Sequence, residues 1–165
     1  MAVVHKFGDN IDTDVIIPAR FCNDPSKEFI SKHCMYDYSL GFAERVSKGD
    51  VIVAGENFGF GSSREAAVWA ILGTGISTVI ASSFARIFYR NAVNTGMELI
   101  ECSEIADIVS DGSSIEVDRK NRRLIVAGKS ITYSSGISDV CSDIIQAGGL
   151  INYINYGAYG ENNNE

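Results

Sequence analysis

The sequence predicts one α/β domain, 1–165, built on a mixed, partly parallel sheet with flanking helices. Three observations lead to this prediction. The chain has 165 residues, 45% of them hydrophobic, which suits a single domain with a sizeable core. Residues 50–101 alternate between apolar strand-like runs and helical runs, the pattern of right-handed crossovers over parallel strands. Residues 113–134 contain short runs of alternating polarity, which are typical of an antiparallel meander.

The N-terminal segment is expected to contain a strand, a turn and an extended stretch. "VVHKF" (3–7) is strand-like. "GDNIDTD" (8–14) is rich in Asp and Asn, whose side chains bond to nearby backbone groups and favour turns. "VIIPARF" (15–21) is expected to be extended and near a sheet edge, because Pro18 cannot donate a hydrogen bond to a central ladder.

A short helix is expected over 26–35, with Asp24 as its N-cap and Pro25 in its first turn. The alternating central region predicts strands at 50–55, 77–82 and 97–101 and helices at 63–75 and 83–96. The first of these helices should end at Gly73 or Gly75, and the second at 94–96.

The C-terminal region should contain the meander and one more helix. A charged turn at 118–123 and a glycine turn at Gly128 separate the predicted strands. The last helix is expected over 137–149, with Ser138 as its N-cap and Gly148 after it. The tail from about 157 is polar and rich in Gly and Asn, so we expect it to be frayed.

The composition excludes several functions. The net charge of −7 argues against nucleic-acid binding, which needs a basic face to displace counterions. No apolar run approaches the roughly 20 residues needed to span a membrane, and the N-terminus does not resemble a signal peptide. We therefore expect a cytoplasmic protein. Its four cysteines form no CxxC pair, which argues against a metal site in this chain and predicts reduced thiols: Cys22, Cys34, Cys102 and Cys141.

The loop "GENFGFGSSREAA" (55–67) precedes a helical run and poses the main chemical question. A P-loop would require a lysine, which this stretch lacks. A dinucleotide-binding fingerprint begins at Gly59 and Gly61, but Arg64 occupies the place of its third glycine. A hydrolase GxSxG motif would require a closing glycine that is also missing.

The remaining chemical alternative is an anion site at a helix start. Free N–H groups and the helix dipole attract a carboxylate there, and Arg64 adds a planar guanidinium. Ser62 and Ser63 offer hydroxyls. A purely structural alternative has equal support from the spacing, because Ser62 and Glu65 fit a capping box, and the two interpretations are compatible.

Two other polar clusters have plain explanations. The aspartates of 9–14 lack the closing glutamate of a calcium loop, which favours a turn stabilised by Asp and Asn side chains. Arg86 and Arg90 lie four residues apart, so they share one helix face, which favours a solvated surface.

Three segments together resemble the small subunits of 3-isopropylmalate dehydratases and, more broadly, the swivelling domain of aconitase-type hydro-lyases. They are "GDNIDTDVIIPARF" (8–21), "GENFGFGSSREAAVWA" (55–70) and "SFARIFYRNAVNTG" (83–96). The resemblance covers about 7–99 and, more loosely, the meander. It implies a swivelling β/β/α domain that isomerises 2-isopropylmalate and 3-isopropylmalate by dehydration and rehydration in leucine biosynthesis.

The resemblance also implies a partner and a site. A separate large subunit would hold a [4Fe-4S] cluster and form a heterodimer or heterotetramer with this chain, which itself would bind no metal, and the substrate would be a small di- or tricarboxylic acid. Ser62 would be the catalytic base, Ser63 and Arg64 would bind a substrate carboxylate, and Asp14 would lie at the active site. Arg20 would bind a distal carboxylate or cover the pocket rim.

Departures from the family pattern leave alternatives open. The segment "IIPARFCND" (16–24) differs from the "IIPxxYLR" of archaeal relatives, and Phe21 would suit an apolar isopropyl pocket. Ala66 stands where aconitases carry a histidine, so no role transfers to it. The alternatives are the small subunit of a homoaconitase or of a dimethylmaleate hydratase. A non-enzymatic alternative is an anion-binding regulatory module that uses the same helix start.

Overall fold

The structure is a computed structural model that describes residues 1–24, 26–133 and 138–157. Within these ranges the strands are β1 (Ala2–Lys6), β2 (Val51–Ala54), β3 (Thr78–Ala81), β4 (Glu98–Glu101), β5 (Ser114–Asp118), β6 (Arg123–Val126) and β7 (Lys129–Thr132). The longer helices are α2 (Lys27–Lys32), α4 (Glu65–Thr74), α5 (Arg86–Thr95) and α7 (Asp139–Gln146). Short helical turns are α1 (Thr13–Ile16), the 3-10 turn η1 (Ala19–Phe21), α3 (Phe42–Arg45), α6 (Ile105–Ile108), α8 (Leu150–Asn152) and the π-helical turn η2 (Tyr153–Gly157).

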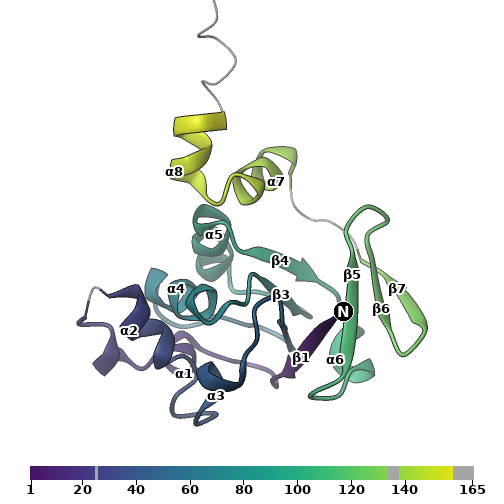
Figure 1. The fold of residues 1–165 in the computed structure, drawn as a ribbon, viewed down its shortest axis with the longest axis horizontal. Helices are drawn as coiled ribbons and strands as arrows, with labels where there is room; N and C mark the ends of the chain where they lie inside the picture. The colour runs from purple at the N-terminus through teal and green to yellow at the C-terminus, as the bar shows by residue number, and fades with distance from the viewer. Residues whose placement is uncertain (25, 134–137, 158–165) are drawn as a thin grey trace, which may run out of the picture.

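The described strands form one mixed sheet in the order β4-β3-β2-β1-β5-β6-β7. β1 to β4 are parallel, and β5 to β7 form an antiparallel meander that joins the parallel half through β1 and β5. Figure 1 shows α4 and α5 beside the parallel strands, and the meander of β5 to β7 on the right of the view. The predicted α/β class with a partly parallel sheet is therefore confirmed.

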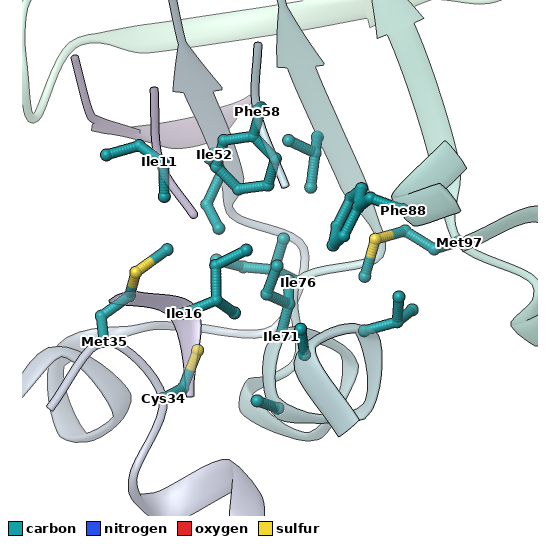
Figure 2. Close-up of a cluster of buried hydrophobic side chains, with 14 of the residues drawn as sticks. Ile11, Ile16, Cys34, Met35, Ile52, Phe58, Ile71, Ile76, Phe88 and Met97 are labelled. Carbon is teal, nitrogen blue, oxygen red and sulfur yellow. The ribbon is translucent and has the colours of Figure 1, made fainter. Parts of the chain in front are cut away.

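β2 and β3 are buried on both faces, which explains their largely apolar sequences. Because successive side chains point to opposite faces, Ile52 and Ala54 enter a core beneath α2 and α4, whereas Val51 and Val53 enter a second core beneath the meander. Figure 2 shows the first core, where Ile52 and Phe58 lie near Ile16 and Phe88. The second core includes α6 and the inner faces of β5 and β6.

Most predicted elements occur at their expected positions. Gly75 is the C-cap of α4 and Gly96 that of α5, both with left-handed backbone, as their lack of a Cβ allows. Ser138 caps α7 by accepting a hydrogen bond from the N–H of Cys141 at 3.4 Å. The expected frayed tail lies mostly outside the described residues. No described helix is both long and apolar enough to cross a membrane.

Two expectations for the N-terminal region were wrong. The segment 15–21 is not one extended stretch: its ends lie in α1 and η1, and only Ile17 and Pro18 between them have an extended backbone. Asp12 caps α1 by accepting from the N–H of Val15 at 2.7 Å, and Ile16 and Ile17 are fully buried. The N-cap of α2 is Ser26, not Asp24, since the hydroxyl of Ser26 accepts from the N–H of Phe29 at 3.2 Å. The Asp24 carboxylate instead accepts from the N–H of Ser26 at 2.8 Å, and Pro25 lies outside the described residues.

Candidate functional site

The candidate site lies where the loops after β1, β2 and β3 meet at the carboxyl ends of these parallel strands. Backbone bonds hold the loops together: the N–H of Gly59 donates to the carbonyl of Ile11 at 2.7 Å, and the N–H of Phe58 donates to the carbonyl of Ser83 at 3.0 Å. Ligands commonly bind at this edge of an open α/β sheet, because the loops there converge on one point. The topology therefore brings the Asp-rich turn and the glycine loop into contact.

The glycine loop needs Gly59 for close packing. Gly59 has φ +79°, and a Cβ at this position would lie 2.2 Å from Cγ of Phe88, a buried residue of α5. Any side chain would therefore clash with the ring and strain the backbone. This close approach fixes the loop that carries Gly61, Ser62 and Ser63, all three of which are exposed to solvent.

Ser62 contacts Thr13, a residue of the Asp-rich turn. Its hydroxyl lies 3.1 Å from Oγ1 of Thr13, and its backbone N–H donates to the same oxygen at 3.2 Å. Thr13 itself is 98% buried, since only 2% of its surface is exposed. The side chain of Ser62 is thus held at the entrance of the site rather than inside the core.

The capping-box interpretation of Ser62 and Glu65 is wrong. The N-cap of α4 is Arg64, which makes no side-chain capping bond. Glu65 accepts a hydrogen bond from the indole N–H of Trp69 at 3.0 Å instead. The first-turn N–H groups of α4 therefore have no side-chain cap from this loop, which leaves a partial positive charge beside Ser62 and Ser63.

Arg64 and Asp14 form an ion pair across the site. The side chain of Arg64 is 26% exposed, and that of Asp14 is 58% exposed. The hydrogen bond to Asp14 raises the pKa of the Arg64 guanidinium above its usual value. Because the bond to Asp14 uses one nitrogen, Nη1, the guanidinium retains N–H donors for a second anion.

The side chain of Arg20 pairs with a carboxylate of this chain, whereas the sequence suggested a substrate carboxylate or the pocket rim. It donates two hydrogen bonds to Asp37, at 2.8 and 2.5 Å, and its guanidinium lies 4.5 Å from the centre of the Phe21 ring. That ring is half-buried and stacks on His33, with ring centres 4.0 Å apart. Cys22, which follows η1, is close enough to Arg64 to influence its pKa. The segment with Arg20 therefore adjoins the site, although Arg20 already has a carboxylate partner.

Sequence reasoning missed two residues of this arrangement, Thr13 and Asp37. Thr13 lies inside the "DTD" motif, where the aspartates drew attention because of their charge. Asp37 lies 17 positions from Arg20, and the local pattern around it gives no signal of the pairing. Only the position of Thr13 next to Asp14, a predicted site residue, could have suggested a role.

The Asp-rich turn behaves as a turn rather than as a metal loop. Asp12 caps α1, and Asp9 accepts a hydrogen bond from the N–H of Glu56 at 2.8 Å. Among the described residues, no group of three or more His, Cys, Asp or Glu side chains could hold a metal ion.

Comparisons with known proteins show what the chain is similar to. Residues 43–104 match the model of the aconitase C-terminal domain. The chain is 48% identical over 155 residues to the 3-isopropylmalate dehydratase small subunit of Halothermothrix orenii, covering 93% of this chain and 94% of that one. It is 46% identical over 153 residues to the 2,3-dimethylmalate dehydratase small subunit of Eubacterium barkeri, covering 92% and 94%.

A solved structure is also similar. The crystal structure of a 3-isopropylmalate dehydratase from Methanocaldococcus jannaschii superposes with a TM-score of 0.88 at 44% identity, over 93% of this chain and 92% of that one.

Proposed function

Because this chain belongs to the family of 3-isopropylmalate dehydratase small subunits, we propose that it isomerises 2-isopropylmalate and 3-isopropylmalate as one half of a hydro-lyase. The observation that carries this function is the position of Ser62, an exposed hydroxyl at the amino end of α4 and next to the Arg64–Asp14 pair. In this proposal Ser62 is the proton acceptor and Arg64 the carboxylate-binding group, two functions that dehydration of a hydroxy diacid requires side by side.

In the proposed mechanism Ser62 acts as its alkoxide. It removes the proton from the carbon next to a substrate carboxylate and becomes a neutral hydroxyl, while the substrate loses its hydroxyl group and gains a carbon–carbon double bond. In rehydration, Ser62 returns the proton to the carbon that lost the hydroxyl group, and hydroxide adds to the carbon that lost the proton, so the net reaction exchanges one hydrogen and one hydroxyl group between neighbouring carbons. The amino end of α4 stabilises the alkoxide, because its N–H groups carry partial positive charge.

Arg64 and Ser63 would bind the substrate carboxylate that adjoins the reacting carbon. The remaining N–H donors of Arg64 suit a carboxylate, and the exposed hydroxyl of Ser63 can donate one more hydrogen bond. Asp14 holds Arg64 in place before the substrate arrives. Arg20 would reach a distal carboxylate only by leaving Asp37, so its alternative role is to hold the η1 segment at the pocket rim.

The partner is the cluster-bearing large subunit, in a heterodimer or heterotetramer, and we place the complex in the cytoplasm. The [4Fe-4S] cluster would be held by that subunit and would supply a Lewis acid for departure of the hydroxyl group. The exposed position of Ser62 and Ser63 supports this arrangement, since a second protein can cover the site.

Reconstitution tests the function. The chain, combined with its cognate large subunit and a reconstituted cluster, should hydrate isopropylmaleate, and Ser62→Ala should abolish most of this activity. Full activity in Ser62→Ala would exclude Ser62 as the base. The similarity to the Eubacterium barkeri protein makes 2,3-dimethylmalate the second substrate to assay, and a preference for it would assign the alternative function.

A further inference from the structure

Thr13 is fixed unusually well for a residue at the edge of a functional site. Its backbone N–H donates to the carbonyl of Phe60 at 2.9 Å, and its own carbonyl accepts from the N–H of Ile17 at 3.0 Å. Its side chain is buried at the start of α1. Thr13 is therefore anchored both to the glycine loop and to the helix that carries Asp14.

The hydroxyl of Thr13 makes two contacts with one residue. Its oxygen accepts the backbone N–H of Ser62 at 3.2 Å and lies 3.1 Å from the hydroxyl oxygen of Ser62. In the neutral pair, either hydroxyl can be the donor. An alkoxide has no proton to donate, so Thr13 must be the donor whenever Ser62 is deprotonated.

The loop is packed closely around this hydroxyl. A Cβ on Gly61, which has φ +98°, would lie 3.3 Å from Oγ1 of Thr13. Three charged side chains lie close to the pair along the chain: Asp12 and Asp14 flank Thr13, and Arg64 is two residues from Ser62. Arg64 is itself paired with Asp14, and its pKa also responds to Asp12 and Cys22. Arg64 favours a negative charge on Ser62, whereas Asp12 and Asp14 oppose it. A neutral hydrogen-bond donor aimed at the Ser62 oxygen would therefore add stabilisation of the alkoxide that these opposing charges do not supply.

We propose that Thr13 is a positioning residue for Ser62: its hydroxyl fixes the direction of the Ser62 side chain and donates a hydrogen bond to the alkoxide. This inference rests on the proposed role of Ser62 as the base. Thr13 does not exchange its proton with the substrate. It lowers the free energy of the charged form of Ser62 relative to the neutral form, because a hydrogen bond to an ion is stronger than one to a neutral group.

The test compares Thr13→Val, which removes the hydroxyl and keeps the shape, with Thr13→Ser, which keeps the hydroxyl. In the reconstituted complex, Thr13→Val should lower kcat about 100-fold, as loss of one donor to a reacting oxyanion does, with little change in KM. Thr13→Ser should retain most of the wild-type kcat. Wild-type kcat in Thr13→Val, or a Thr13→Ser variant as inactive as Thr13→Val, would overturn the proposal.

Two controls make the result specific. Thr78→Val, on β3, removes another buried threonine hydroxyl, which donates to Glu98 of β4 at 2.8 Å, and it should leave kcat near wild type. In a Ser62→Ala background, Thr13→Val should have no further effect on the residual rate, because the two residues act through one oxygen. A further 100-fold loss in that background would refute action through Ser62.

The outcomes separate this inference from the function on which it rests. If Ser62→Ala is inactive but Thr13→Val is fully active, the base stands and the role of Thr13 is refuted. If Ser62→Ala is fully active, the base itself is refuted. Should Thr13→Val fail to assemble with the large subunit, Thr13→Ala removes the same hydroxyl with a smaller side chain. It should likewise lower kcat about 100-fold and have no further effect in the Ser62→Ala background.

Discussion

Arg64 and Asp14 lie 50 positions apart in the chain and form an ion pair at the mouth of the candidate site. The pair joins α1 to the start of α4 and holds the guanidinium beside Ser62 and Ser63. Because the carboxylate neutralises Arg64 in the free subunit, a substrate carboxylate would add to or replace an existing interaction rather than meet a bare cation.

Arg64→Ala should weaken catalysis through lost carboxylate binding. Removal of a hydrogen bond to a charged group costs about 1.5–3 kcal/mol, which corresponds to a loss of roughly 10- to 150-fold in kcat/KM. Arg86→Ala is the matched control, since Arg86 is exposed on α5. Steady-state kinetics of the reconstituted complex measure both variants. If Arg64→Ala and Arg86→Ala have the same kcat/KM, Arg64 does not bind the substrate.

Gly59→Ala should destabilise the fold much more than Gly128→Ala. Both glycines have φ +79°, so both variants incur backbone strain of about 1–2 kcal/mol. Only Gly59 faces a side chain, that of Phe88, and the clash should add about 1–3 kcal/mol. Urea unfolding measures the difference in free energy of unfolding. Identical midpoints for the two variants would contradict the packing assigned to Gly59.

The buried pair of His5 and Asp50 predicts a loss of stability in acid. Burial by itself raises the pKa of Asp50, but hydrogen bonds from His5 at 3.0 Å and from the N–H groups of Ser47 and Val3 outweigh it and hold the pKa below its usual value. A carboxyl group with a lowered pKa in the folded state contributes stability above its unfolded pKa, near 4, and loses it as the pH falls through the folded pKa.

Asp50→Asn should therefore be less stable than wild type at pH 7, with a difference of roughly 1–3 kcal/mol that shrinks as the pH drops below about 4. Urea titrations across this pH range measure the effect. Asp107→Asn is the control, because Asp107 is exposed on α6. A difference between wild type and Asp50→Asn that stays constant down to low pH would be incompatible with the pairing.

The four thiols should react at two distinct rates. Cys34 and Cys102 are buried, and burial raises the pKa of both, so the reactive thiolate is scarce and inaccessible. Cys22 and Cys141 are half-buried and free. A chromogenic disulfide reagent should modify two cysteines quickly in the native protein and all four after unfolding. Fast modification of Cys34 in a folded sample would refute its placement in the core.

Local patterns predicted most of the fold. The strands β2, β3 and β4 and the helices α4 and α5 follow from apolar runs and helical periodicity, which depend on neighbours within a few residues. The segment 15–21 shows the limit of such reasoning: its apolar residues and Pro18 indicate an extended strand, but Asp12 and the core below α4 impose a short helix instead.

For the site, the sequence alone determined the glycine loop, the serine pair, the arginine and the aspartates, because each belongs to a short motif with a recognisable spacing. Only the tertiary structure decided which of them meet. Arg64 contacts Asp14, Arg20 contacts Asp37, and Ser62 is held by Thr13 rather than by Glu65. These pairings depend on how the loops converge at the ends of parallel strands, and distances across a sheet are set by packing of the whole domain rather than by separation along the chain.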